Sequence, residues 1–219
     1  PELGRDELNE DNATDIYKSL SELKGSALKI AQMLSMDKNI LPKSYTDKFS
    51  QSQYNAPPLS GPLIVRTFSK YFGKTPEQIY DKFKLNSTHA ASIGQVHEAE
   101  LNGKKLAVKI QYPGVGDSIS SDLKLIKPFA FRLLGMSEKE LNIYIKEVEE
   151  RLLEETDYLL EVKRSIEITE ACKDLPHVVF PTYYPQLSSK RVITMSWIQG
   201  LHLREFLKTK PSQELRNKI

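Results

Sequence analysis

The 219-residue chain carries 31 basic and 29 acidic residues, for a formal net charge of +2 at pH 7, and 39% of its residues are hydrophobic. This balance is typical of a globular protein and argues against a disordered chain or a polyanion-binding surface. The single cysteine, Cys172, excludes an intramolecular disulfide and argues against zinc. We expect no metal site in this chain, and no nucleic-acid partner, because no basic stripe is interleaved with aromatic residues.

The first 85 residues are predicted to be helical. Apolar residues recur at steps of three and four over residues 12–36, and Lys29 and Gln32 lie roughly opposite that stripe. Shorter helical patterns cover residues 43–53, 63–72 and 76–83. We therefore expect a helical extension over residues 1–85.

From residue 86 the pattern changes to strands and longer helices. Residues 92–101 and 105–111 are strand-like and meet at Asn102-Gly103, a pair that favours a tight hairpin turn. Helices are predicted over residues 117–135 and 138–172, strands over 177–182 and 191–197, and a short helix from Leu201. The order predicts an α+β fold with one small antiparallel sheet.

A loop of small residues comes directly before the hairpin, and its second strand contains Lys109, within HAASIGQVHEAELNGKKLAVKIQ (89–111). Small residues let the backbone approach a phosphate closely, and a lysine on the next strand can supply positive charge to it. A lysine in such a strand can also simply face solvent. Only Gly94 in the loop is a glycine, so the pattern alone leaves both interpretations open.

The predicted helix over residues 138–172 has a carboxylate within its apolar stripe. The stripe is Leu141, Ile145, Val148, Leu152, Glu155, Leu159, Val162 and Ile166. Burying an unpaired carboxylate is costly, so Glu155 is expected to meet a cation or to be protonated. Asp157 and Glu161 are four residues apart and could serve one site together. Alternatively, Glu150, Glu154, Asp157 and Glu161 form a solvated acidic side.

Five ordered motifs resemble the UbiB/ADCK family of unorthodox protein-kinase-like proteins. They are ALKIAQMLS (27–35), AASIGQVH (90–97), LAVKIQYPGV (106–115), EETDYLLE (154–161) and RVITMSWIQG (191–200). The resemblance runs from about Leu20 to the end. It implies a protein-kinase-like N-lobe, ATP as the nucleotide ligand, peripheral association with a membrane on its cytoplasmic or matrix side, and support of isoprenoid quinone biosynthesis with lipid or protein partners there.

The resemblance also implies roles for individual residues. Lys29 and Gln32 match the lysine and glutamine of the family's KxGQ motif, whose helix crosses the active cleft. Glu155 and Asp157 match the ExD acids, which engage that helix and the surroundings of the nucleotide. The implied catalytic set is therefore Lys29, Gln32, Glu155 and Asp157.

The implied nucleotide-binding set comprises a loop, an ion pair and a hinge. The loop residues are Ala90, Ala91, Ser92, Gly94 and Gln95; the pair is Lys109 with Glu161; the hinge is Met195, Ser196, Trp197 and Ile198. Two positions depart from the family pattern. Ala31 replaces the glycine of KxGQ, and His89 replaces the first alanine of the loop; we expect His89 at the surface.

Several residues that a kinase fold needs for phosphoryl transfer do not occur in this sequence. None of the four histidines heads a catalytic-loop pattern, and no DFG follows. We expect residues 86–200 to form the N-lobe, residues 201–219 to begin the linker to a C-lobe that this chain lacks, and Mg²⁺ to bind only in a full-length protein. The start at Pro1 fits an excerpt of a longer protein.

Two other functions stay open. One is a non-catalytic module that docks a protein or lipid partner, and the other is the small lobe of a conventional protein kinase. The alanine-rich loop and the helix of Lys29 argue against the second, because that helix would obstruct a peptide substrate. No run of about 18 apolar residues occurs, so we expect no membrane span.

Overall fold

The computed structural model describes residues 58–91, 93–134 and 137–217. The predicted helices over residues 12–36 and 43–53, and with them Lys29, Ala31 and Gln32, lie outside the described residues, as does Ser92. The expectations for these positions therefore stay predictions.

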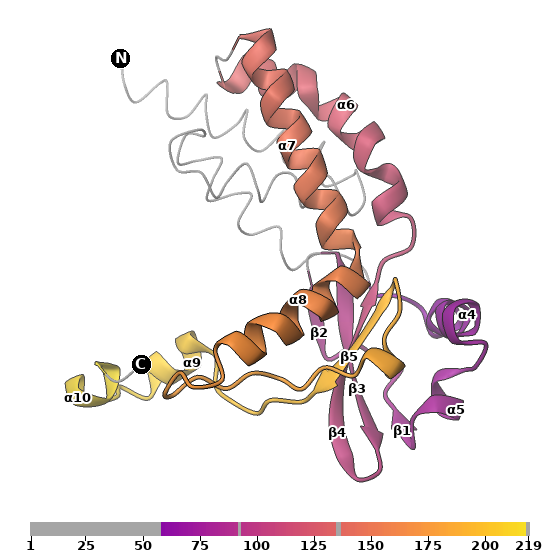
Figure 1. The fold of residues 1–219 in the computed structure, drawn as a ribbon, viewed down its shortest axis with the longest axis vertical. Coiled ribbons are helices and arrows are strands. Elements are labelled where there is room, and N and C mark those ends of the chain that lie inside the picture. The colour runs from indigo at the N-terminus through magenta and orange to yellow at the C-terminus, as the bar shows by residue number, and fades with distance from the viewer. Residues whose placement is uncertain (1–57, 92, 135–136, 218–219) are drawn as a thin grey trace.

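Helices flank a single antiparallel sheet (Figure 1). The elements before the hairpin are α4 (Gly61–Phe72), α5 (Pro76–Ile79), β1 (Lys82–Phe83) and β2 (His89–Ala91). The hairpin is β3 (Gly94–Leu101) and β4 (Lys104–Gln111), followed by α6 (Val115–Leu134), α7 (Glu138–Thr156) and α8 (Tyr158–Ala171). The chain continues with a 3₁₀ turn, η2 (Pro185–Leu187), then β5 (Val192–Ser196), α9 (Leu203–Lys208) and α10 (Gln213–Arg216).

The predicted hairpin is confirmed and forms the centre of the sheet. The strand order is β1-β3-β4-β5, and β2 also pairs with β3. Asn102 and Gly103 have φ angles of +51° and +70°, which suit the two central positions of a tight hairpin turn. The α+β class and the small antiparallel sheet of a kinase-like N-lobe are thus present.

The two faces of the sheet pack against different helices. On one face, Ile64 and Phe68 of α4 meet Leu106 and Val108 of β4 in a buried core. On the other face, Tyr158 and Val162 of α8 pack with Ile193 of β5. Because successive strand residues point to opposite faces, Lys109, which pairs with Ile193, belongs to the face that α8 covers. In Figure 1, α4 and α8 accordingly lie on opposite sides of the sheet, and α6 and α7 project from it together.

One helix predicted before the hairpin and one strand predicted after it are wrong. The helix expected over residues 76–83 ends at Ile79, and Lys82–Phe83 forms β1, so the first 85 residues are not all helical. The strand expected over residues 177–182 does not form. His177 has a left-handed φ of +64°, and strand pairing with β5 begins only at Thr182. Residues 59–83 share a core with the sheet, and the domain boundary near residue 85 stays a prediction.

The helix predicted over residues 138–172 is two helices, α7 and α8, separated by Asp157. Asp157 has φ −88° and ψ 86°, and its side chain accepts a hydrogen bond from the Leu160 N–H at 3.1 Å. An aspartate that caps a helix N-terminus favours a new start over continuation. The break changes the phase of the apolar stripe, so Leu159 and Ile166 of the predicted stripe are exposed. Glu155 is partly buried, and the expectation that it meets a cation or is protonated stays a prediction.

A buried polar network ties the start of the described chain to β3. His97 is fully buried; its Nδ1 lies 2.8 Å from the Lys84 carbonyl and its Nε2 lies 2.8 Å from Gln95 Nε2. A carbonyl only accepts, so Nδ1 carries the hydrogen, and the Gln95 amide donates to Nε2. Gln95 Oε1 accepts from the Leu59 N–H at 2.8 Å. The network is satisfied only by a neutral imidazole.

We expect this network to make the fold sensitive to acid. Burial lowers the pKa of His97 from its ordinary 6.5. The unfolded chain therefore takes up a proton that the folded chain resists, and the contribution of His97 to stability is present above about pH 6.5 and is lost as the pH falls below it. Urea unfolding at pH 7.5 and 5.5 measures the loss. His97→Asn should reduce it, whereas His177→Asn, at an exposed histidine, should retain it; equal losses in the two variants would refute this role.

Candidate nucleotide-binding site

The centre of the candidate site is an ion pair between β4 and α8. Lys109 Nζ donates to the two carboxylate oxygens of Glu161 at 2.9 and 3.1 Å. The Lys109 side chain is 20% exposed and that of Glu161 35% exposed, so the pair is partly withdrawn from water while still open to a ligand. The contact expected between these two residues is confirmed. The alternative of a simply solvent-facing lysine on this strand is wrong.

A tyrosine ring forms the floor beneath the lysine. Lys109 Nζ lies 4.8 Å from the centre of the Tyr158 ring, within the range of a cation–π interaction. Tyr158 is fully buried. Tyr158 and Glu161 are three residues apart at the start of α8, and such pairs share one helix face, so both meet the same ammonium. Burial raises the pKa of the Tyr158 hydroxyl well above its ordinary 10, and the Glu161 charge adds to this.

The junction of α7 and α8 is held to the sheet by a second side chain of β4. Gln111 Nε2 donates to the Thr156 carbonyl at 3.0 Å, one residue before the Asp157 cap. Gln111 and Lys109 are two residues apart on one strand and so point to the same face. The start of α8 is thereby fixed at its cap, at Thr156 and at Glu161.

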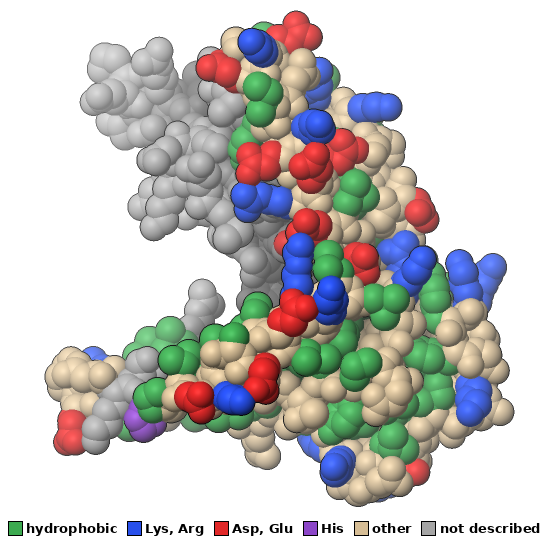
Figure 2. Space-filling view, viewed as in Figure 1, with side chains coloured by type: hydrophobic (Ala, Val, Ile, Leu, Met, Phe, Trp, Pro, Cys, Tyr) green, Lys and Arg blue, Asp and Glu red, His purple; other side chains and the backbone are tan. Residues whose placement is uncertain are grey.

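The four acids that the sequence placed on one side of a helix have different surroundings. Glu150 and Glu154 are exposed and lie beside Lys146 and Arg164, respectively. The nearby Arg164 guanidinium lowers the pKa of Glu154. Asp157 is a helix cap, and only Glu161 reaches Lys109. Figure 2 shows acidic and basic side chains interspersed over α7 and α8, as expected for a solvated surface. The contacts expected of Glu155 and Asp157 with the helix of Lys29 stay predictions.

The loop residues named from sequence do not all face the lysine. Ala90 and Ala91 lie in β2, paired with Gln95 and Gly94. The Gln95 side chain is buried on the opposite face of the sheet, bonded to Leu59 and His97, and so is not part of the lysine face.

Gly94 has a packing role that the sequence did not reveal. A Cβ atom there would lie 2.3 Å from the Ile110 carbonyl oxygen. The glycine is needed for the close approach of β3 to β4.

The hinge residues continue β5 toward the surface. Met195 pairs with Ala107, and Ser196 with Leu106, on β4. The N–H groups of Ser196 and Trp197 donate to the Thr182 and Lys105 carbonyls at 2.8 and 3.1 Å. These two donors are thus used within the protein, and the expectation that hinge backbone groups bind adenine stays a prediction for residues 195–198, of which Ile198 is exposed.

His89 lies at the surface beside the hinge. It is exposed, as predicted, and its ring centre lies 6.0 Å from that of Trp197 and 6.4 Å from that of His202. Lys105 Nζ lies 4.4 Å from the Trp197 ring centre. Whether His89 reaches a phosphate stays open.

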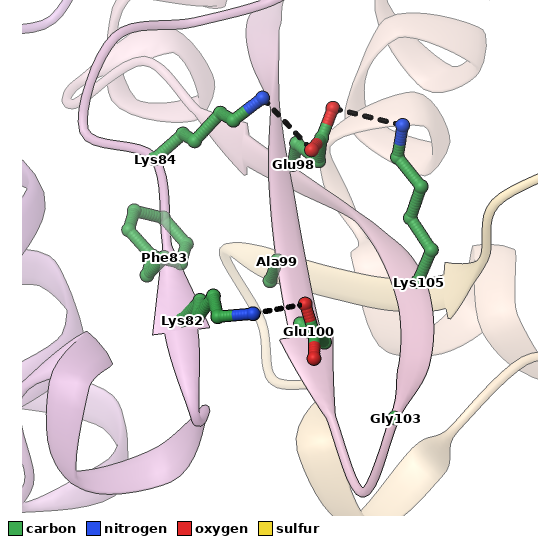
Figure 3. Close-up of a pocket in the computed structure, with 8 residues that line it drawn as sticks. All are labelled: Lys82, Phe83, Lys84, Glu98, Ala99, Glu100, Gly103 and Lys105. Carbon is green, nitrogen blue, oxygen red and sulfur yellow. Dashed lines mark hydrogen bonds and ion pairs between the residues drawn. The ribbon is translucent and has the colours of Figure 1, made fainter.

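A hollow of about 220 Å³ near the hairpin is a different feature (Figure 3). Its charged side chains already pair with one another. Glu98 binds Lys84 at 2.8 Å and Lys105 at 3.0 Å, and Lys82 binds Glu100 at 2.9 Å. These exposed cross-strand pairs are typical of a solvated sheet surface, and the hollow is not the candidate site. Within the described residues, no group of three or more His, Cys, Asp or Glu could hold a metal ion.

A protein-family model, ABC1 atypical kinase-like domain, matches residues 51–219. The chain belongs to the ABC1 atypical kinase-like family. This is the UbiB/ADCK family that the motifs resemble. Relatives include the atypical kinase COQ8, mitochondrial, of Saccharomyces cerevisiae, 34% identical over 97% of this chain and 42% of its own length.

A further curated relative and a solved structure are also similar to this chain. The probable serine/threonine-protein kinase abkA of Dictyostelium discoideum is 33% identical over 95% of this chain and 39% of its own length. Among solved structures, a Rv3197–erythromycin complex from Mycobacterium tuberculosis matches with a TM-score of 0.60 and 29% identity, over 97% of this chain and 55% of that one. The chain spans less than half the length of the curated relatives COQ8 and abkA.

Sequence reasoning missed three polar residues around the helix junction: Gln111 and Tyr158, which are buried, and Arg191, whose NH1 atom is buried. Tyr158 carries a usable signal, because it precedes Glu161 by three residues in EETDYLLE and so shares its helix face. Gln111 carries a weaker one, as a polar residue two positions after Lys109 on the same strand face. Nothing local marks Arg191, because its guanidinium lies near Gly116, which is distant in sequence.

We predict that Gly94→Ala destabilises the fold by about 3 kcal/mol, because the added methyl group must displace backbone atoms of β4. Gly200→Ala is the matched control, since nothing lies within 4 Å of a Cβ there. It should change the free energy of unfolding by less than about 0.5 kcal/mol. Urea unfolding measures both. Equal stability of the two variants would contradict the close approach.

We predict that Asp157 stabilises chiefly as a helix cap. Asp157→Ala should lower the free energy of unfolding by about 1 kcal/mol, whereas Asp157→Asn should keep most of it, because asparagine caps helices about as well as aspartate. Chemical denaturation of the three proteins distinguishes the cases. If the asparagine variant is as unstable as the alanine variant, the charge matters rather than the cap.

Proposed function

We propose that this chain is the nucleotide-binding lobe of an ABC1 atypical kinase and binds ATP on the sheet face that α8 covers. The observation that carries the proposal is the Lys109–Glu161 pair, partly buried but reachable from solvent. An ammonium group has three donors, and two of them meet the Glu161 carboxylate. The third can serve a phosphate oxygen, as the strand lysine of a kinase-like lobe does.

The β2–β3 loop supports this assignment. Ala91 and Gly94, which pair with each other and with Gln111, present little side-chain bulk on the face of Lys109. Backbone N–H groups in such a loop can approach phosphates closely. Glu161 would orient the lysine, and the hinge end of β5 would receive the base.

Phosphoryl transfer or ATP hydrolysis is a proposal for a longer protein. Such chemistry needs a catalytic-loop aspartate and residues that hold Mg²⁺, and neither pattern occurs in this sequence, which spans less than half the length of the relatives abkA and COQ8. Support of isoprenoid quinone biosynthesis at a membrane is likewise a proposal, taken from the family resemblance. The relative COQ8 of Saccharomyces cerevisiae is named mitochondrial. None of the helices in the described ranges is long and apolar enough to cross a bilayer.

We predict that ATP with Mg²⁺ raises the melting temperature of the protein and that Lys109→Ala lowers its ATP affinity about tenfold or more, because a charge-assisted contact to phosphate is lost. Thermal shift titrations give the apparent affinity. Lys104→Ala is the matched control, an exposed lysine on the same strand. It should bind ATP like the wild type.

Adenosine separates phosphate binding from base binding in the same titrations. The affinity for adenosine should be equal in wild type and Lys109→Ala, since Lys109 is assigned to phosphate. If ATP binds Lys109→Ala as tightly as wild type, the lysine has no part in binding. If ATP does not stabilise the wild-type protein at all, the chain is better described as a docking module.

A further inference from the structure

We infer that Tyr158 is a positioning residue: the face of its ring holds the Lys109 ammonium where Glu161 and a phosphate can both reach it. The inference deepens the proposed function and rests on it for its meaning in ATP binding. It stands on two contacts to one nitrogen, the ring at 4.8 Å and the carboxylate at 2.9 Å.

The ring supplies what the carboxylate alone cannot. Lysine has a flexible four-carbon stem, and a partly exposed ion pair allows several rotamers. The negative face of an aromatic ring attracts a cation from a second direction, and this attraction grows when water is excluded. The fully buried ring of Tyr158 excludes water from one side of the ammonium. Two contacts from different directions define one position.

The hydroxyl end of the ring lies in a buried polar region. The Tyr158 hydroxyl, Gln111 Oε1 and Arg191 NH1 are all buried, with no hydrogen-bond partner within the described ranges. Burial raises the pKa of the Tyr158 hydroxyl, and the Gln111 side chain and the Arg191 charge oppose that rise. A Cβ at Gly116 would lie 3.4 Å from the two terminal guanidinium nitrogens of Arg191 and 3.3 Å from Thr156 Oγ1, so Arg191 lies close to the start of α6.

The packing around the ring fixes its orientation. Tyr158 is fully buried and packs with Val162 of its own helix and Ile193 of β5. Because Gln111 and Lys109 lie on one strand face, β4 supplies both the ammonium over the ring face and the side chain that holds the Thr156 carbonyl. The tyrosine thereby couples the helix junction to the position of the ammonium.

Ring fluorination tests the inference without changing the shape of the core. Phe, 4-fluoro-, 3,5-difluoro- and 3,4,5-trifluorophenylalanine are placed at position 158 of the full chain. Each fluorine withdraws electron density from the ring face, so the attraction for a cation falls stepwise while the packing stays nearly constant. The same series at Tyr183, which packs against the same core cluster, is the control.

Two readouts are followed. The first needs no nucleotide: the rate at which acetic anhydride modifies Lys109, measured by mass spectrometry with exposed Lys104 as the internal reference. We expect the Lys109 rate to rise roughly fivefold from phenylalanine to trifluorophenylalanine at position 158. The second is affinity for ATP with Mg²⁺, which should fall by a similar factor while affinity for adenosine stays constant. Neither quantity should change in the Tyr183 series.

Equal Lys109 rates throughout the position-158 series would overturn the inference. So would a rise in the Tyr183 series of the same size, because that would indicate a general loosening of the core. If the wild-type protein does not bind ATP, the proposed function fails and the labelling rates alone decide whether Tyr158 positions Lys109. A purely structural tyrosine would give flat rates across the fluorine series.

Discussion

The ion pair between Lys109 and Glu161 is the interaction on which the arrangement of this lobe depends. It joins a strand and a helix that are 52 residues apart in the chain. A cation and a carboxylate that are partly removed from water stay charged at acceptable cost only when they are paired. The position of α8 on the sheet and the direction of the lysine are therefore set together, and Tyr158, Gln111 and the Asp157 cap all act on that same junction.

The two faces of the sheet carry different polar residues. Alternate residues of β3 and β4 point to opposite sides, so Gln95 and His97 enter the core next to α4 while Lys109 and Gln111 meet α8. Gly94, the first residue of β3, is required by the close approach of β4. A residue that the family resemblance assigns to the phosphate loop is therefore also needed for packing of the sheet.

Much of the fold follows from local patterns. The hairpin turn at Asn102-Gly103, the strand of Lys109, β5 and the helices over residues 115–134 and 203–208 were predictable, because each rests on neighbouring residues. The pairing of Lys109 with Glu161 came from family resemblance rather than periodicity. The helix break was predictable in principle from Asp157, but an unbroken spacing of three and four through Glu155 favoured one long helix.

By itself the sequence determined the family, the α+β class, the hairpin and which chemical groups are available near the loop. Tertiary structure alone decided which of those groups meet: that Gln95 turns inward to His97, that Glu150 and Glu154 stay on a solvated surface, and that Tyr158 lies beneath Lys109. The physical reason is that periodicity assigns a residue to a face of its own element only. What that face contacts depends on how distant segments pack, and β4 and α8 are brought together by burial and charge pairing across the sheet.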